Sequence, residues 1–295
     1  MKKVIFRGIA TALITPTNTT GVDYKKLAKL LDWQIDEGID ALVVCGTTGE
    51  SSTLSDAEHR RVIEFSVDHV AGRVPVIAGT GSNETAYALS LTLHAAQAGA
   101  DAALVVTPYY NKATQKGLVR MYHELADQGG LPIIAYNVPS RTGVNIDPAT
   151  CAARAEHENI VGLKEAGGDL SKLVETVALA GDKLPIYAGN DDQIVPVLSM
   201  GGLGCISVLS NLLPAATREI VRRFEAGDVA GSRALQCRYH RLISALFCEV
   251  NPIPVKAAMS ALGYCENFLR LPLTAMEEDH RERLLYEMRE VGLAV

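Results

Sequence analysis

A lysine at the end of an apolar segment is the residue of this sequence with the clearest chemical potential. Residues 160–163 are all apolar, and Lys164 follows them directly. So short an apolar segment indicates a buried strand, which places the lysine where the strand gives way to a loop. Burial disfavours the charged ammonium form, and a neutral amine can attack a carbonyl carbon. The competing interpretation is a lysine that extends its ammonium group from the strand end into water.

Polar side chains with possible catalytic uses follow other apolar segments. Residues 46–49, Gly-Thr-Thr-Gly, form a turn whose backbone amides and two hydroxyl groups, on Thr47 and Thr48, can hold a carboxylate. Tyr136 ends another apolar segment and carries a hydroxyl group that can move protons. Arg141 carries a planar guanidinium suited to a carboxylate. Taken singly, these residues also fit an ordinary turn, a packed tyrosine and a surface arginine.

Strand-like and helix-like segments alternate through the first two thirds of the chain. The strand-like segments are residues 8–14, 41–45, 74–79, 102–107, 132–136, 160–163, 185–189 and 204–208. The helix-like segments between them are residues 23–37, 55–71, 83–98, 116–128, 148–157, 170–180 and 192–200. The strand-like segments hardly alternate between polar and apolar residues, which is typical of parallel strands covered on both faces. This succession predicts the α/β class and a (β/α)8 TIM barrel, with a doubly wound open sheet as the alternative.

Helix signals agree with this division of the chain. Ser55 followed by Glu58 is a capping-box pattern, and Asp147 before Pro148 predicts an N-cap with proline in the first turn. After about residue 214 only helix-like segments follow, at residues 215–225, 228–248, 254–262 and 275–291. The first of these closes the barrel. We therefore predict a catalytic barrel over residues 1–225 and a C-terminal helical extension over residues 226–295, packed on it as one unit.

The barrel prediction brings the polar residues together. In a TIM barrel the carboxyl ends of all strands meet at one face, and active sites lie there. Thr47, Thr48, Tyr136, Arg141 and Lys164 all stand at or after such ends. This convergence favours a reactive lysine over one that merely reaches water.

Composition narrows the class of protein further. The chain of 295 residues has a formal net charge of -6, which argues against nucleic acid as a partner. No apolar stretch reaches the roughly 18 residues that a membrane helix needs, and the N-terminus lacks the apolar core of a secretion signal.

The six cysteines form no C-x-x-C pair, and the pair Asp191-Asp192 fits a cap of the next helix better than a magnesium site. We expect a cytoplasmic enzyme with no metal ion, no organic cofactor and no membrane partner.

Four stretches of the sequence resemble the dihydrodipicolinate synthase branch of the class I, lysine-dependent aldolase and lyase family. Three match the family's signature stretches: residues 46–50 (Gly-Thr-Thr-Gly-Glu), 136–143 (Tyr-Asn-Val-Pro-Ser-Arg-Thr-Gly) and 162–166 (Gly-Leu-Lys-Glu-Ala). The fourth, residues 251–256 (Asn-Pro-Ile-Pro-Val-Lys), is typical of the synthase branch. The similarity runs from about residue 8 to residue 276, nearly the whole chain.

The resemblance implies condensation of pyruvate with L-aspartate 4-semialdehyde to 4-hydroxy-tetrahydrodipicolinate, on the route to diaminopimelate and lysine. The Schiff base with pyruvate would form on Lys164. The proton relay would consist of Thr47, Tyr136 and Tyr110, with Tyr110 entering from a neighbouring subunit. Substrate binding falls to four residues: Thr48, Arg141, Gly189 and the backbone at Ile206. The resemblance also implies a homotetramer built as a dimer of dimers.

Two alternative functions are kept beside this one. A sister lyase would cleave a sialic acid or a sugar-derived keto acid with the same imine lysine, but Arg141 favours an acceptor with a second carboxylate. A barrel that binds a keto acid and signals, without turnover, would not need Lys164, Tyr136, Thr47 and Tyr110 together.

Feedback inhibition by lysine is a separate expectation from the resemblance. In regulated members of the family lysine binds at the dimer interface, near the loops after the second and third strands. The matching positions are Ser52, Leu54, Asp56, His59, Asn83, Tyr87 and Tyr109. Asp56 stands in place of a histidine, and Tyr87 stands in place of a glutamate that can pair with an ammonium group of lysine. The sequence therefore predicts an enzyme that lysine inhibits weakly or not at all.

Overall fold

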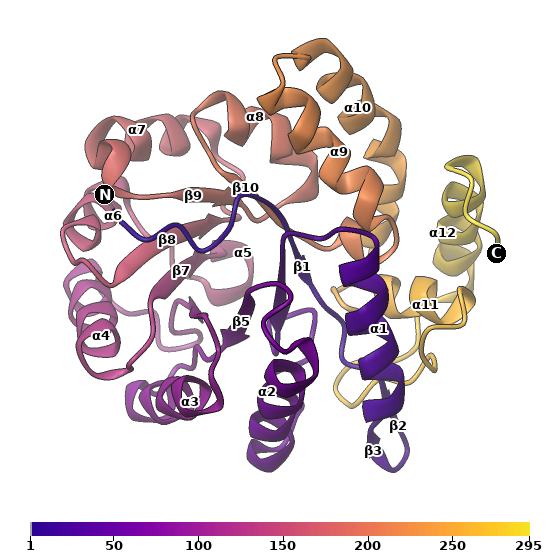
Figure 1. Cartoon of the computed structure of the whole chain (residues 1–295), viewed down its shortest axis with the longest axis horizontal. Coiled ribbons are helices and arrows are strands. Elements are labelled where there is room, and N and C mark those ends of the chain that lie inside the picture. The colour runs from indigo at the N-terminus through magenta and orange to yellow at the C-terminus, as the bar shows by residue number, and fades with distance from the viewer. Residues whose placement is uncertain (1) are drawn as a thin grey trace.

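A closed barrel of eight parallel strands forms the centre of the protein (Figure 1). The computed structural model describes residues 2–295. The strands are β1 (Gly8–Ala12), β4 (Ala41–Val44), β5 (Val76–Gly79), β6 (Ala102–Val106), β7 (Ile133–Asn137), β8 (Ile160–Glu165), β9 (Ile186–Ala188) and β10 (Gly204–Ser207). They are hydrogen-bonded in the order β1-β10-β9-β8-β7-β6-β5-β4, and β1 pairs with β4 to close the ring. The predicted TIM barrel is confirmed, and the doubly wound sheet is excluded.

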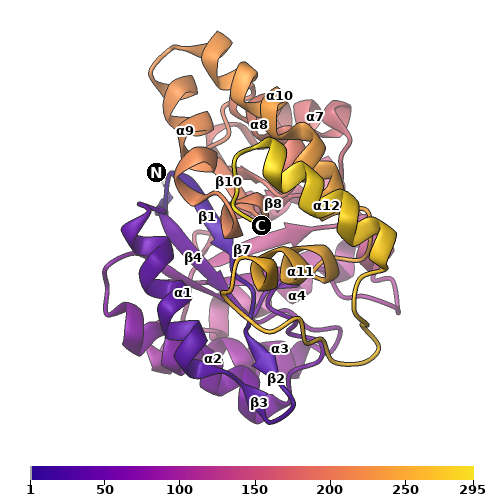
Figure 2. The same ribbon diagram turned by 90° about the vertical axis from the view of Figure 1, so that its right-hand side faces the viewer.

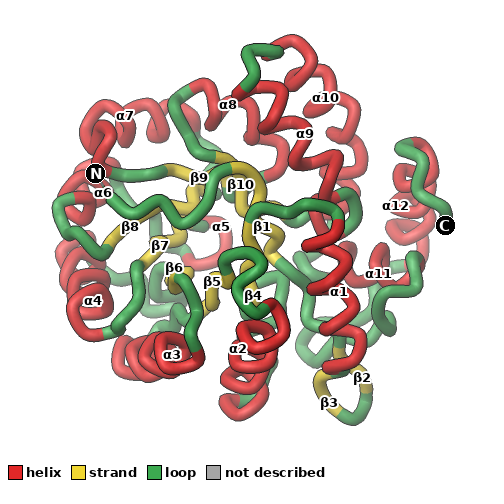
Figure 3. Tube along the Cα trace, viewed as in Figure 1, coloured by secondary structure: helices red, strands yellow, loops and turns green. Residues whose placement is uncertain are grey.

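Helices surround the strands as an outer layer, drawn in red around the yellow strands in Figure 3. They are α1 (Tyr24–Asp36), α2 (Asp56–Val70), α3 (Thr85–Ala98), α4 (Gln115–Gln128), α6 (Pro148–Ala155), α7 (Leu170–Ala180), α8 (Ile194–Ser199) and α9 (Pro214–Glu225). Each overlaps a helix-like segment of the sequence. Helix α8 is shorter than predicted, because residues Asp191–Gln193 form a separate 3-10 turn before it.

Short elements escape the sequence pattern. A hairpin of β2 (Thr17–Asn18) and β3 (Gly21–Val22) follows β1, and the four-residue helix α5 (Pro139–Thr142) follows β7. Two further 3-10 turns are Gly181–Lys183 and Leu209–Asn211. Elements of two to four residues have too few positions to show a period, so sequence reasoning has no signal for them.

The two predicted helix caps differ in outcome. Ser55 accepts a hydrogen bond from the Glu58 amide, and the Glu58 carboxylate accepts one from the Ser55 amide, so the predicted capping box is confirmed. Asp147 stands at the N-cap of α6 with Pro148 in the first turn, but its side chain makes no cap hydrogen bond. Its carboxylate instead accepts from Nδ2 of Asn145, at 3.2 Å. A proline has no N–H, so this first turn presents one donor fewer to a cap.

The apolar core has two parts, one between strands and helices and one inside the barrel. Leu42 and Val44 of β4 belong to the outer part, whereas Ala41 and Val43 belong to the inner part. This alternation is the two-residue period of a strand. The same period directs Lys164 inwards, because it stands one position from Leu163, which faces the helices.

The C-terminal extension consists of α10 (Val229–Leu246), α11 (Ile253–Ala261) and α12 (Glu278–Glu290). Helix α10 packs against α9 and α12, and Figure 2 shows α11 and α12 together on one side of the barrel. Lys256 of α11 reaches the barrel, where its Nζ lies 2.5 Å from Oε1 of Glu50. We propose residues 1–225 as the barrel and 226–295 as the extension. Among residues 2–295, none of the helices combines the length and the apolar character needed to span a bilayer.

Candidate active site

Lys164 and Tyr136 lie side by side near the carboxyl ends of β8 and β7. The two residues are partners in the register of these strands, and Nζ of Lys164 lies 4.3 Å from the centroid of the Tyr136 ring. Lys164 is only 5% exposed. Strand β8 continues through Glu165, so the lysine is the second-last strand residue and does not begin the loop as predicted. The strand backbone therefore holds its Cα more firmly than a loop would.

A cavity of about 110 Å³ opens above these two residues at the C-terminal face of the barrel. Six of the predicted site residues line this cavity: Thr47, Thr48, Tyr136, Arg141, Lys164 and Gly189. Apolar side chains of the barrel interior, Ala12, Val43 and Leu104, line it together with these polar groups. An apolar enclosure with a few convergent polar groups is the usual form of a small-molecule site.

The turn that carries Thr47 and Thr48 is held by close backbone packing. Cys45 and Glu50 on either side of it have positive φ angles, of 53° and 57°. A Cβ at Gly79 would collide with the carbonyl oxygen of Cys45, so only glycine allows β5 to pass this close. The hydroxyl group of Thr15 donates to the carbonyl of Gly49, at 2.7 Å. This close packing fixes the conformation of the turn, which favours a binding turn over the ordinary βα connection of the alternative interpretation.

Arg141 and Gly189 lie at the cavity for different structural reasons. Arg141 belongs to the short helix α5, which begins at Pro139 soon after β7. This helix places the guanidinium at the rim of the cavity. Within residues 2–295, no carboxylate forms an ion pair with Arg141, so its charge faces the cavity and solvent. Gly189 donates its N–H to the carbonyl of Glu165, at 2.7 Å, and a Cβ at this position would collide with Ala166.

Two predicted site residues are not among those that line the cavity. Ile206 is fully buried in β10, and its side chain belongs to the core inside the barrel. Tyr110 is 90% exposed and lies in the loop after β6, with a positive φ of 73°. A bulky residue rarely adopts such a backbone conformation, and the outliers found in proteins cluster at functional positions.

Sequence reasoning assigned no role to several residues that line the cavity, and four of them carry polar or aromatic side chains. They are Ser140, Asn190, Phe247 and Asn251. Phe247 and Asn251 come from the helical extension, which therefore contributes to the site. The family-like stretch at residues 251–256 was the one signal that could have pointed to Asn251, but nothing in its pattern places it near the barrel mouth.

Two carboxyl groups lie close in sequence to cavity residues: Asp191, which is buried, and Glu165, which is partly buried. Asp191 accepts hydrogen bonds from the Ser207 hydroxyl and from the backbone amides of Val208 and Leu209. The sequence predicted that the pair Asp191-Asp192 caps the next helix, and this is wrong. Asp191 instead points inwards to the 3-10 turn after β10. Burial raises the pKa of Asp191 against the opposing effect of these donors. Burial likewise raises the pKa of Glu165, whose carboxylate accepts from Nδ2 of Asn137.

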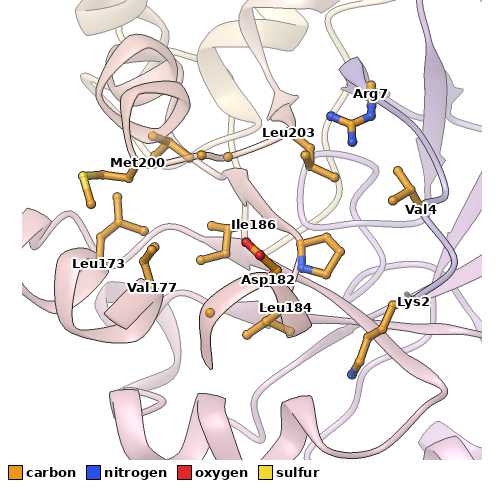
Figure 4. Close-up of a pocket in the computed structure, with 15 residues that line it drawn as sticks. Lys2, Val4, Arg7, Leu173, Val177, Asp182, Leu184, Ile186, Met200 and Leu203 are labelled. Atoms are coloured by element: carbon orange, nitrogen blue, oxygen red, sulfur yellow. The ribbon is translucent and has the colours of Figure 1, made fainter. Parts of the chain in front are cut away.

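A larger cavity, of about 480 Å³, lies at the opposite end of the barrel (Figure 4). It is lined by residues that precede or begin β9 and β10, such as Pro185, Ile186 and Leu203. Its side chains are mostly apolar, and its cations Lys2 and Arg7 stand at the edge in Figure 4. The amino-terminal face of a TIM barrel serves stability in characterised enzymes, so we place the chemistry at the smaller cavity.

Known proteins resemble this chain in sequence and in structure. The model of the dihydrodipicolinate synthetase family matches residues 5–290. A 4-hydroxy-tetrahydrodipicolinate synthase of Thermoanaerobacter sp. (strain X514) is 48% identical over 290 residues, which cover 98% of each chain. A crystal structure of the chloride-inhibited dihydrodipicolinate synthase from Acinetobacter baumannii, complexed with pyruvate, is 42% identical, covers 99% of this chain and 100% of that chain, and has a TM-score of 0.96.

A third similar structure bears on assembly. It is described as the first monomeric dihydrodipicolinate synthase variant, is 40% identical, covers 98% of each chain and has a TM-score of 0.96. The family match over nearly the whole chain and the identity to these relatives agree with the barrel described above. The chain therefore belongs to the dihydrodipicolinate synthetase family.

Proposed function

We propose that Lys164 forms the imine through which this chain condenses pyruvate with L-aspartate 4-semialdehyde to 4-hydroxy-tetrahydrodipicolinate, in diaminopimelate and lysine biosynthesis. The condensation reaction itself follows from membership of the family. The position of Lys164, buried at the cavity beside the Tyr136 ring, is the single observation that carries the residue assignment.

Lys164 is better placed for this role than the other lysines. Lys256 is also buried, but its Nζ donates to Glu50, to the Thr17 hydroxyl and to the carbonyl of Phe268. These three acceptors engage Nζ of Lys256, and Lys256 does not line the cavity, so this amine is not presented to a substrate there. Lys112 is exposed and does not line the cavity. Lys164 alone among the described lysines lines the cavity.

The reaction runs through a balanced series of bonds. The Lys164 amine adds to the keto carbon of pyruvate, and loss of water gives the imine. The protonated imine nitrogen withdraws electrons, so a methyl proton leaves and an enamine forms. The enamine carbon attacks the aldehyde carbon of the semialdehyde. The amine of the second substrate then adds to the former keto carbon, and the bond to Lys164 breaks as the ring closes.

These steps need protons to move in both directions near Lys164. Tyr136 and Thr47 both line the cavity, and their hydroxyl groups would carry protons between the carbinolamine oxygen and solvent. Thr48, in the same turn, and the backbone near Gly189 and Ile206 would bind pyruvate. The guanidinium of Arg141 at the rim would bind the carboxylate of the semialdehyde, because a planar fork can make two parallel hydrogen bonds to it.

The same arginine separates the synthase from a sister lyase that cleaves sialic acid. A polyhydroxy substrate needs hydroxyl partners at the rim, whereas Arg141 supplies an unpaired positive charge there. A keto-acid-binding protein without turnover would have no use for a relay of hydroxyl groups around a buried amine.

Assembly completes this proposal. Tyr110 would reach the site of a neighbouring subunit, since it is almost fully exposed and does not line the cavity of its own chain. We propose a homotetramer, built as a dimer of dimers, in the cytoplasm. A monomeric variant with this fold exists among the similar structures, so the fold alone does not dictate the assembly.

Reductive trapping tests the assignment of the lysine. Borohydride added with pyruvate should fix one adduct per subunit, and peptide mass mapping should locate it at Lys164. Lys164→Ala should abolish both trapping and turnover, whereas Lys112→Ala, which removes an exposed lysine, should leave both intact. An adduct mapped to Lys256 or Lys112 in the wild-type protein would overturn the assignment.

A further inference from the structure

We propose that Asn251 of the helical extension is a positioning residue for pyruvate, which acts by orienting the hydroxyl group of Thr48. Its Nδ2 donates to Oγ1 of Thr48, at 3.0 Å. Both side chains are buried, and both residues line the cavity that contains Lys164. The inference rests on the proposed function in one respect, namely that Thr48 holds pyruvate.

The hydrogen bond decides which way the Thr48 proton points. A threonine hydroxyl has one proton to donate and two lone pairs. Because one lone pair of Oγ1 accepts from Asn251, the proton of Thr48 is left to point elsewhere. This arrangement offers the proton to an acceptor in the cavity, such as the carboxylate of pyruvate, and it costs no reorganisation when the substrate arrives.

Asn251 is not used by its own helix. An asparagine ahead of a helix commonly caps the first turn with its side chain. Here the N-cap of α11 is Pro252, and no side-chain cap hydrogen bond is present. The Asn251 amide is thus free to reach across to the barrel, and Oδ1 is buried with no hydrogen-bond partner within the described part of the chain.

A second contact keeps Asn251 opposite Thr48. Glu50 and Lys256 form a fully buried ion pair. Glu50 stands two residues after Thr48, and Lys256 stands five residues after Asn251. Lys256 also donates to the hydroxyl group of Thr17 and to the carbonyl of Phe268. Two separate links between the same two segments fix their relative position, which a single hydrogen bond could not do. The extension is therefore part of the pyruvate site.

Three variants test the proposal through pyruvate binding. The measured quantities are the pyruvate concentration that half-saturates borohydride trapping, and the KM values for pyruvate and for aspartate semialdehyde. Asn251→Ala should raise both pyruvate values about 2- to 10-fold, the effect of one neutral hydrogen bond, with little change in the semialdehyde KM. Asn251→Asp keeps the shape of the side chain but can only accept, so it should take the Thr48 proton and raise the pyruvate values further.

The Thr48→Val background separates positioning from packing. If Asn251 acts through the Thr48 hydroxyl, Asn251→Ala should change pyruvate half-saturation no further once that hydroxyl is absent. Equal effects of Asn251→Ala in both backgrounds would overturn the proposal. So would an Asn251→Asp enzyme that binds pyruvate like wild type, because Thr48 would then be donating to residue 251.

A matched control addresses loosening of the extension. Arg270 also joins the extension to the barrel, through Glu58 and the carbonyl of Thr53, but it does not line the cavity. Arg270→Gln should lower the thermal stability and leave pyruvate half-saturation unchanged; an equal shift in this variant would refute the role of Asn251. Trapping that occurs at Lys164 but is insensitive to Asn251 contradicts this inference alone, whereas absence of trapping in wild type contradicts the proposed function.

Discussion

Nζ of Lys164 lies over the face of the Tyr136 ring, 4.3 Å from its centroid. The register of β7 and β8 sets this relationship, since the two residues are direct partners across the strands. A ring face attracts a cation, and this contact does not involve the Tyr136 hydroxyl group. Tyr136 thus has two separable functions: its ring contacts Lys164, and its hydroxyl can relay protons.

Replacing Tyr136 by phenylalanine separates these functions. The ring contact with Lys164 is kept, whereas the proton-carrying hydroxyl is lost. We expect kcat to fall about 100- to 10,000-fold, the range of general acid–base catalysis, while borohydride still traps pyruvate on Lys164 at a lower rate. Tyr122→Phe is the control, because its hydroxyl donates to the carbonyl of Val105 away from the cavity. Unchanged turnover in Tyr136→Phe would remove Tyr136 from the relay.

Arg141→Ala tests the choice of the second substrate. Loss of one charge-assisted contact of roughly 1.5–3 kcal/mol should lower kcat/KM for aspartate semialdehyde about 10- to 150-fold. Imine formation with pyruvate should largely survive, because Arg141 stands at the rim and not beside Lys164. Efficient cleavage of sialic acid by the wild-type protein, or normal use of the semialdehyde by the variant, would contradict the synthase assignment.

Mixed oligomers test the role of Tyr110. If this exposed tyrosine completes the site of a neighbour, Tyr110→Phe and Lys164→Ala proteins are each inactive or nearly so, but a mixed pair contains one site with both residues intact. Subunit exchange should therefore restore part of the activity. Verified mixed dimers without recovery would place Tyr110 in the site of its own subunit or outside the chemistry.

Lysine should inhibit this enzyme weakly or not at all. Tyr87 lines a cavity of about 360 Å³ next to the active site, where regulated relatives have a glutamate, and its hydroxyl donates to Asp56 at 2.9 Å. Asp56 already pairs with Arg60, so its charge is not free to replace that glutamate. Losing one charged contact of roughly 1.5–3 kcal/mol raises an inhibition constant about 10- to 150-fold.

Initial rates with increasing L-lysine measure this effect. Tyr87→Glu should increase the sensitivity to lysine, because it restores a carboxylate to the cavity. Strong partial inhibition of the wild-type enzyme below millimolar lysine would show that Tyr87 does not have the effect assigned to it.

The ion pair between Glu58 and Arg270 should make stability depend on pH. The hydrogen bond from Arg270 lowers the pKa of Glu58 from 4.5 to about 2. A carboxyl group whose pKa falls on folding stabilises the native state above its unfolded pKa, and this contribution is lost as the pH falls from 4.5 towards 2. Glu58→Gln should lower the free energy of unfolding at pH 7 by about 1 kcal/mol, since the pair is partly screened by solvent.

Denaturant unfolding at several pH values checks this expectation. The difference between wild type and Glu58→Gln should shrink as the pH approaches 2. Glu64→Gln is the control, because Glu64 forms a more exposed pair with Arg61. A difference that stays constant across this pH range would show that the ion pair is not its source.

Strands, helices and the reactive lysine follow from local patterns. Each strand-like segment lies in the barrel, because a run of apolar residues buried on both faces is readable from neighbouring positions alone. The convergence of Thr47, Tyr136 and Lys164 follows in turn, since a barrel places all its strand ends at one face. Hairpin β2–β3 and helix α5 carried too few residues for such a pattern.

Contacts between distant segments could be decided only by the folded chain. The sequence predicts that Asp191 caps the helix after it, but its carboxylate accepts from the amides of Val208 and Leu209 after β10. A local pattern does not reveal these donors, because they lie in a different segment of the chain. Thr48 and Asn251 are 203 positions apart, so no periodicity links them. By itself the sequence determined the barrel, the polar strand ends and Lys164, since these depend on the residue types of short segments. The tertiary structure decided that the extension lines the cavity at Lys164, because that contact depends on how α11 packs against the barrel.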